Sequence, residues 1–357
     1  MKKYFLYELK KNALSALIIT VFACAIYLVG VLTANFEPIE YPYDNMGGMR
    51  TIIPNSLISI PLITLMVLCT LIPILMFSFK MSSRQADCFY SMPIRREKVY
   101  LVKSAVGLLL AVVPYTVAYW LGFVVTACKP NGFLLSAFVP VFFISLPLAV
   151  VLFGINAFVF TRANRPIDGV IFIALYSCAG AMLMGSVFRF IASFSSEKVY
   201  SIYNYLGTDF SSWFTYSPLS WLTSKYTGII SRKTPTYKFE WLLYLFAGVT
   251  GAAAWAGLFL TARSEKAENA ERVSDSWFGY KVLVPFYLVF ALSFLDLYAQ
   301  GGSAANGLSY TGLVMFAAGG LVGYIIFRRT ILLKAADWLS LLGAFILGIC
   351  LSFVLWR

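Results

Sequence analysis

Few side chains in this sequence could carry out catalysis. The 357 residues include no histidine and six cysteines, and no two cysteines form a C-x-x-C pair. Histidine is the usual general base and the commonest metal ligand, so its absence disfavours both kinds of site. Most of the cysteines lie inside apolar runs, as small buried side chains do. We therefore predict no catalytic residue and no metal site in this chain.

Nucleotide binding is disfavoured for a similar reason. The sequence contains no G-x-x-x-x-G-K-(S/T) motif, the loop whose backbone amides hold nucleotide phosphates. If this protein uses ATP, a separate subunit must bind it.

Ionisable residues inside apolar runs are the remaining candidates for functional residues. Burying a charge in a membrane is costly, so a residue that does so usually has a function. Asp296 and Arg189 lie near the ends of two such runs, and Asp168 lies at the boundary of one. An ion-coupled carrier places carboxylates or broken helices near the midplane, and Asp296 is off centre. Snorkelling of Asp296 and Arg189 towards the interface is the simpler interpretation.

Composition indicates that lipid surrounds most of the chain. Hydrophobic residues make up 60% and charged residues 12%, against ~25% charged in soluble domains. The net charge is +12, but Lys and Arg lie mostly between apolar runs. Without a basic stripe interleaved with exposed aromatic residues, nucleic-acid binding is disfavoured.

Apolar runs of about 18 residues or more can cross a bilayer as helices, and we predict an all-α integral membrane protein with about nine transmembrane spans. The fourth contains Pro140 and Pro147, which should bend or tilt it, and the seventh is short. The spans are 13–33, 56–79, 105–127, 133–160, 168–190, 241–262, 282–298, 308–327 and 338–356.

Most of the 28 Lys and Arg residues lie on the same side as the N-terminus, which the positive-inside rule makes cytoplasmic. The C-terminus is then outside, and the compartment is the plasma membrane. Before the first span, Tyr4, Phe5, Leu6 and Leu9 lie among lysines. This pattern predicts a short interfacial amphipathic helix, although an ordinary positive flank would look the same.

The longest predicted external segment, residues 191–240, is rich in aromatic residues, which prefer the membrane–water boundary. We expect short helices that cap the outer end of a translocation path. The proposed gate residues, which would line the exit or hold a leaving substrate, are Trp213, Phe214, Trp221 and Tyr226. A cap that only seals a dimer against the outer leaflet is the alternative.

The most informative cytoplasmic segment is residues 80–103, KMSSRQADCFYSMPIRREKVYLVK. It is too polar for the membrane and too long for a tight turn. Pro93 disfavours helix at Met92, so the segment should form a short helix over 84–90, a break, and a second helix. We call it the elbow. Its Phe89 and Tyr90 are expected to be exposed, which is costly unless a partner covers them.

The elbow resembles that of permease subunits of type-2 ABC transporters, where an S-x-P-(I/V)-x-R element joins a coupling helix to the third span. Two further strings agree with this family: YSPLSWL at 216–222 and ARSEKAENA at 262–270, although Asn269 stands where glycine is common. The resemblance covers roughly residues 1–270. Residues 271–357 add three spans, as in the longer permeases of Gram-positive bacteria.

The resemblance implies a six-span permease core over 1–270, including the N-terminal interfacial helix, the elbow 80–103 and the external segment 191–240, followed by a three-span extension over 271–357. It implies a separate cytoplasmic ABC ATPase that binds ATP and Mg²⁺, and a second copy or sister permease. The residues that would couple this chain to the ATPase are Arg84, Gln85, Asp87, Phe89, Tyr90, Pro93 and Arg95.

The implied function is ATP-driven export of a hydrophobic or amphipathic substrate such as a peptide, lipid or drug. Three alternatives stay open. The chain could be an ion-coupled secondary carrier, an enzyme acting on lipid-linked substrates, or a non-transporting sensor or immunity subunit, because fold does not fix function.

Overall fold

The computed structural model describes residues 2–33, 38–39, 50–51, 55–91, 93–128, 135–193, 217–221, 240–263, 265, 267–274, 276–293 and 303–355. The described part is almost entirely helical. Its α-helices are α1 (Lys2–Thr33), α2 (Asn55–Phe77), α3 (Ser83–Tyr90), α4 (Arg96–Ala127), α5 (Leu135–Thr161), α6 (Pro166–Ser193), α11 (Glu240–Ala262), α12 (Tyr280–Ser293), α13 (Ser303–Arg328) and α14 (Ala335–Leu355).

Short elements complete this description. The 3₁₀-helix η1 (Ser78–Met81) follows α2, and η3 (Ala267–Asn269) follows α11. Strands β1 (Pro38–Ile39) and β2 (Arg50–Thr51) pair antiparallel between the first two predicted spans.

The all-α membrane architecture is confirmed. Within the described residues, eight helices are long and apolar enough to cross a membrane, namely α1, α2, α4, α5, α6, α11, α13 and α14. The predicted seventh span corresponds to α12, which is apolar but has 14 residues. The predicted end of that span, Tyr298, lies outside the described residues, so the ninth span remains a prediction.

The start of the chain differs from the expectation. α1 runs without a break from Lys2 to Thr33, so the residues expected in a separate interfacial helix belong to the first span helix. Glu8 connects this end of α1 to α4. Its side chain is buried, accepts a hydrogen bond from Tyr4 at 3.0 Å, and pairs with Lys103 of α4 at 3.4 Å.

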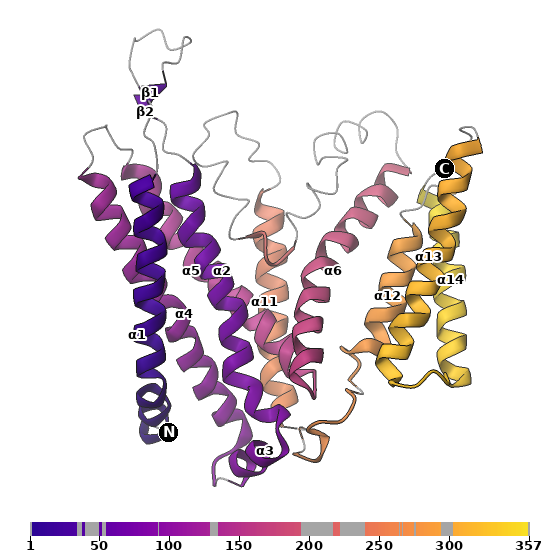
Figure 1. Cartoon of the computed structure of the whole chain (residues 1–357), viewed down its shortest axis with the longest axis horizontal. Helices are drawn as coiled ribbons and strands as arrows, with labels where there is room; N and C mark the ends of the chain where they lie inside the picture. The colour runs from indigo at the N-terminus through magenta and orange to yellow at the C-terminus, as the bar shows by residue number, and fades with distance from the viewer. Residues whose placement is uncertain are drawn as a thin grey trace. The chain divides into compact units, whose positions relative to one another are not determined.

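The chain divides into two compact units. Unit 1 comprises residues 1–161 and 218–268, and unit 2 comprises residues 162–217 and 269–357. In unit 1, α2 and α4 lie between α1 on one side and α5 and α11 on the other, and α3 lies at the same end as the N-terminus (Figure 1). Aromatic side chains fill the interior, and at Gly122 of α4 a Cβ would overlap the buried ring of Tyr27 of α1.

One proline in the unit 1 helices is compensated by a side chain. Pro73 of α2 has no N–H to give to the carbonyl of Cys69, four residues earlier. Asn156 of α5 donates its side-chain amide to that carbonyl at 3.1 Å, and Asn156 is itself buried. Because lipid offers no substitute donor, such a bond is required where a backbone carbonyl loses its helix partner in a membrane. It also fixes α2 against α5.

Unit 2 contains α6, α12, α13 and α14. This grouping differs from the predicted division at residue 270, which placed the fifth span with the first four. Polar side chains explain the grouping. Buried Asp168 of α6 accepts hydrogen bonds from Tyr280 of α12 at 3.0 Å and from Arg329, just after α13, at 3.2 Å. Tyr176 of α6 donates to the carbonyl of Phe278 at 3.1 Å.

The same unit holds a second buried carboxylate. Asp337, in the first turn of α14, makes two hydrogen bonds with Arg328 of α13, at 2.7 and 2.8 Å. The guanidinium and carboxylate planes thus meet in the two-pronged geometry that suits an arginine. This pair fastens the end of α13 to the start of α14.

The structure makes the predicted orientation testable with two native cysteines. Cys88 is exposed on α3, and Cys128 is exposed directly after α4. α4 has 32 residues and is about 48 Å long, enough to separate them across a bilayer. In variants that retain one of these cysteines, an impermeant maleimide applied to intact cells should label Cys128 and leave Cys88 unlabelled.

Opening the membrane should make Cys88 reactive, and a permeant maleimide is the control that both thiols react. Labelling of Cys88 in sealed cells would reverse the orientation. Labelling of both from outside would show that α4 does not cross the membrane.

Candidate functional site

The elbow has the predicted helical organisation. After α2 the chain forms η1, then α3 over Ser83–Tyr90, one residue longer than the predicted helix 84–90. Pro93 and Arg95 are exposed, and Arg95 is the residue before the first turn of α4. The carbonyl of Arg95 accepts from the amide of Lys98 at 2.9 Å, which starts that turn.

α3 has two distinct faces. Ala86 is buried, and Phe89 and Tyr90 are half-buried on the same side, three and four residues later. Arg84, Gln85, Asp87 and Cys88 are exposed on the other side. We call these four residues the outer face of α3.

The prediction that Phe89 is exposed is wrong. Its ring centroid lies 4.6 Å from that of Phe79 of η1, and the Lys103 ammonium lies 4.4 Å from the centre of the Phe89 ring. Lys103 also lies 4.5 Å from the Phe79 ring and carries the ion pair with Glu8. Phe89 is therefore covered by its own chain, with a cation over its face.

Tyr90 was likewise expected to be exposed, and it too contacts its own chain. Its hydroxyl donates to Glu265 Oε2 at 3.3 Å and lies 3.4 Å from the Tyr100 hydroxyl. Burial, with the charge of Glu265 adding to it, raises the pKa of Tyr90 to about 12. The phenol therefore stays protonated at neutral pH and acts as a donor.

Glu265 is the centre of this arrangement. It lies three residues after α11 and is 7% exposed. Its carboxylate accepts from Tyr90, from Tyr100 of α4, and from Lys80 of η1, whose Nζ lies 2.6 Å from Oε1. Its backbone carbonyl accepts from Arg96 of α4. We call these five residues the Glu265 cluster.

Lys80 links the cluster to a further helix. Besides Glu265, its ammonium donates to the carbonyl of Thr161, the last residue of α5. A helix leaves its final carbonyls without backbone partners, so a cation there both satisfies a hydrogen bond and opposes the negative end of the helix dipole. One buried lysine thus joins the end of α2, the end of α5 and the segment after α11.

An exposed ion pair lies beside the cluster. Arg263, directly after α11, meets Glu97 in the first turn of α4 with two hydrogen bonds of 2.7 and 3.3 Å. Hydrogen bonding to Glu97 raises the pKa of Arg263. This contact joins the same two helices as Glu265, but solvent weakens it.

Of the four proposed gate residues, Trp221 lies within the described part of the chain. Trp221 is 1% exposed, and its ring meets Phe246 of α11 edge to face at 6.2 Å between centroids. Its side chain is packed rather than open to a path. Trp213, Phe214 and Tyr226 lie outside the described residues. Asp296 and the side chain of Arg189 also lie outside them.

Within the described part of the chain, four acidic side chains are buried, and each pairs with a cation. The pairs are Glu8 with Lys103, Asp168 with Arg329, Glu265 with Lys80, and Asp337 with Arg328. Over the same residues, no group of three His, Cys, Asp or Glu side chains is arranged to hold a metal ion. The acids in these pairs hold segments together.

No protein-family model, curated protein or solved structure matches this chain. The contacts of the elbow are therefore the main basis for a functional proposal.

Glu265 was not among the predicted site residues. The string ARSEKAENA drew attention to its neighbourhood only through a resemblance. The signal in the residues themselves is that Lys80 and Glu265 each lie just past the end of an apolar run, on the same predicted side of the membrane. That places them at a similar depth, but it does not tell which spans are neighbours.

A double-mutant cycle tests the Glu265 cluster. Lys80→Met leaves a buried carboxylate without its cation, and Glu265→Gln leaves a buried ammonium without its anion. Each should destabilise the purified protein by about 3–5 kcal/mol. The double variant should recover most of this loss, because the amide still accepts from both tyrosines and no charge remains buried.

The measurement is unfolding in detergent by temperature or denaturant. Glu97→Gln is the matched control, because it removes one charge from the exposed pair with Arg263, and it should have little effect. If the loss of unfolding free energy in the double variant equals the sum of the losses in the two single variants, Lys80 and Glu265 do not act as a pair.

Proposed function

We propose that the chain is the membrane-spanning permease subunit of an ABC transporter, and that α3 is the helix through which a separate ATPase acts. The observation that carries this proposal is the division of α3 into two faces. Its inner face is fixed to the chain by Phe89, Tyr90 and Ala86, while its outer face presents charged and polar side chains. A short helix held in this way can receive a force from a partner and transmit it.

The contacts behind α3 reach four long helices. α3 follows α2 through η1 and precedes α4. Its Tyr90 donates to Glu265 after α11, and Lys80 of the adjoining η1 donates to Glu265 and to the end of α5. Movement of α3 would therefore displace several membrane helices together, as expected of a rigid-body switch. ATP and Mg²⁺ would bind to the ATPase, and the substrate path would lie between this chain and a second permease.

The proposal also agrees with the ion pairs. An ion-coupled carrier needs carboxylates that take up and release their ion within the membrane. Among the described residues, every buried carboxylate is neutralised by a lysine or arginine instead. By the resemblance, the transporter is an exporter of a hydrophobic or amphipathic peptide, lipid or drug.

Fewer of the predicted coupling residues are available to contact the ATPase than the sequence indicated. Arg84, Gln85 and Asp87 remain the residues proposed to touch the ATPase, joined by exposed Cys88. Pro93 and Arg95 are exposed next to them. Phe89 and Tyr90 instead hold α3 in place, so Phe89→Asp would disturb the elbow itself and could not isolate the contact.

The test is purification of the tagged chain from its own cells, with identification of any co-purifying P-loop ATPase and measurement of ATP hydrolysis. Arg84→Glu with Asp87→Arg should lower the retained ATPase about tenfold, a loss of about 1.4 kcal/mol of binding. The chain purified alone should hydrolyse no ATP.

Two controls make this result specific. Arg272→Glu reverses an exposed charge outside the elbow and should retain the ATPase. The thermal unfolding midpoint of the α3 double variant should equal that of the parent, because the outer face is exposed. An unchanged amount of ATPase with the α3 variant, or no ATPase with the parent, would overturn the proposal.

A further inference from the structure

The first turns of α1 carry a concentrated positive charge. Four lysines of this helix are exposed, namely Lys2, Lys3, Lys10 and Lys11. Among the described residues, none of these four lysines forms an ion pair. The acidic residue of α1 is Glu8, which is buried and pairs with Lys103 at 3.4 Å. Glu8 therefore does not neutralise the exposed lysines, and their charge is open to a partner outside the chain.

Two of these lysines lie on a face of α1 that continues along the membrane span. With 3.6 residues per turn, side chains at i, i+4, i+7, i+11, i+14 and i+18 share one face of a helix. The residues that this spacing aligns are Lys3, Tyr7, Lys10, Leu14, Leu17 and Val21. All six are exposed, and we call them the α1 stripe. The stripe is basic over its first two turns and apolar from Leu14 onward.

The change along the α1 stripe matches the depth at which a bilayer itself changes. α1 has 32 residues and is about 48 Å long, while a bilayer with its headgroup regions is ~40–45 Å thick. The rise from Lys10 to Val21 is about 16 Å, close to the ~15 Å that is half of the hydrocarbon core. When α1 crosses the membrane, the apolar part of the stripe therefore lies within one leaflet and the basic part lies among its headgroups.

The basic part of the stripe presents groups that suit a phosphate. Long side chains on a helix lean towards its N-terminus, so Lys10 leans towards Lys3, and Tyr7 lies between the two. Two ammonium groups and a phenol are all donors for phosphate oxygens. The positive-inside count predicts that this end of α1 is cytoplasmic, and anionic lipids give the cytoplasmic leaflet a negative potential.

We infer that the α1 stripe binds one anionic phospholipid of the cytoplasmic leaflet. The phosphate lies between Lys3 and Lys10, beside the Tyr7 hydroxyl, and one acyl chain runs along the apolar part of the stripe. Side chains form this site, and the free backbone amides at the start of α1 are not used. A lipid suits this face better than a protein partner does, because the stripe continues directly into an exposed apolar surface of the span. The site is independent of α3 and of any ATPase.

Native mass spectrometry of the purified full chain with added lipid tests this inference. The probes are dioleoylphosphatidylglycerol, which is anionic, and dioleoylphosphatidylcholine, which has the same chains and no net charge. The parent should retain phosphatidylglycerol preferentially. The variant Lys3→Gln with Lys10→Gln should lower that preference at least about fivefold, the factor that corresponds to about 1 kcal/mol from one lysine near an anionic headgroup.

The matched control is Lys2→Gln with Lys11→Gln. It removes the same charge from the same turns of α1, but positions 2 and 11 lie about 80–100° away from the stripe around the helix. The control should therefore keep most of the preference for phosphatidylglycerol. Both double variants should unfold at the parent temperature when no lipid is added, because the four lysines are exposed.

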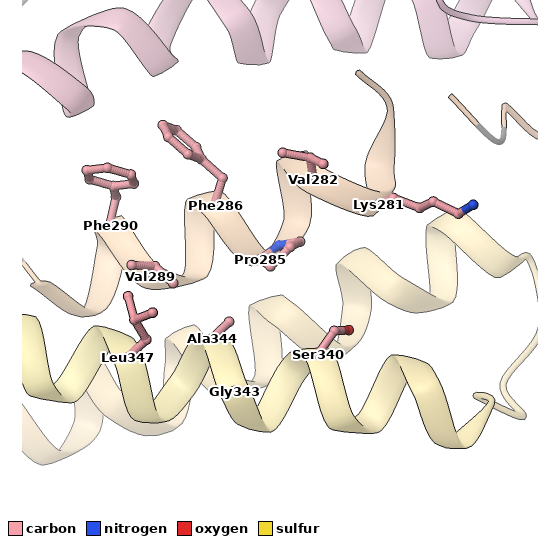
Figure 2. Close-up of a pocket in the computed structure, with 10 residues that line it drawn as sticks. All are labelled: Lys281, Val282, Pro285, Phe286, Val289, Phe290, Ser340, Gly343, Ala344 and Leu347. Atoms are coloured by element: carbon pink, nitrogen blue, oxygen red, sulfur yellow. The ribbon is translucent and has the colours of Figure 1, made fainter. Parts of the chain in front are cut away.

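A second control concerns lipid held elsewhere in the chain. Unit 2 has a groove of about 390 Å³ between α12 and α14, and Gly343 lines it (Figure 2). A Cβ on Gly343 would meet no heavy atom within 4 Å, so Gly343→Leu fills part of this groove without a clash. This variant should leave the preference for phosphatidylglycerol unchanged.

Three results would overturn the inference. Equal retention of the two lipids by the parent would remove the role of charge. Equal losses in the two lysine variants would show diffuse attraction between α1 and the membrane surface in place of a site on the stripe. An unchanged lipid preference in the variant of Lys3 and Lys10, together with loss of a co-purifying ATPase, would assign this face to a protein partner.

Discussion

An ammonium and a carboxylate cannot both leave water at a membrane boundary unless they meet, and in unit 1 Lys80 and Glu265 meet at 2.6 Å with side chains 9% and 8% exposed. The cost of removing each charge from water is several kcal/mol, and only close contact with further hydrogen bonds offsets it. Tyr90 and Tyr100 supply those bonds to Glu265, and the carbonyl of Thr161 accepts from Lys80. The position of the elbow follows from this requirement.

The same constraint acts on the backbone. In lipid a carbonyl that loses its helix donor has no water to replace it. Asn156 serves the carbonyl that Pro73 leaves behind at Cys69, and Lys80 serves the end of α5. In unit 2 the side chains of α6 play this part, with Tyr176 donating to the carbonyl of Phe278. Polar side chains in these helices therefore mark the places where segments are joined, more than places where chemistry occurs.

Composition and periodicity predicted the helices well because each span is set by local properties, the length and apolarity of one run. The helix of the elbow was predictable for the same reason, from Pro93 and the polar residues before it. The contacts that the sequence did not reveal are mostly between segments far apart in the chain. Tyr90 looks exposed when residues 80–103 are considered alone, because only the adjacency of α11 brings Glu265 to it. Phe89 is the exception, since Phe79 and Lys103, which cover it, lie close to it in the chain. Likewise, the grouping of α6 with the C-terminal helices depends on Asp168 meeting Tyr280 and Arg329.

Stability alone does not account for the choice of charged residues at this joint. Replacing a buried ion pair by apolar residues of similar volume is often neutral or stabilising, so an apolar cluster could hold the elbow as firmly. An apolar cluster, however, tolerates sliding, because its contacts have no direction. Hydrogen bonds to one carboxylate do have direction, and a shift of α3 by one turn would break the bond from Tyr90 to Glu265. For a helix proposed to transmit force, a single allowed position is more useful than additional stability, and the Glu265 cluster supplies the directional contacts that such a position requires.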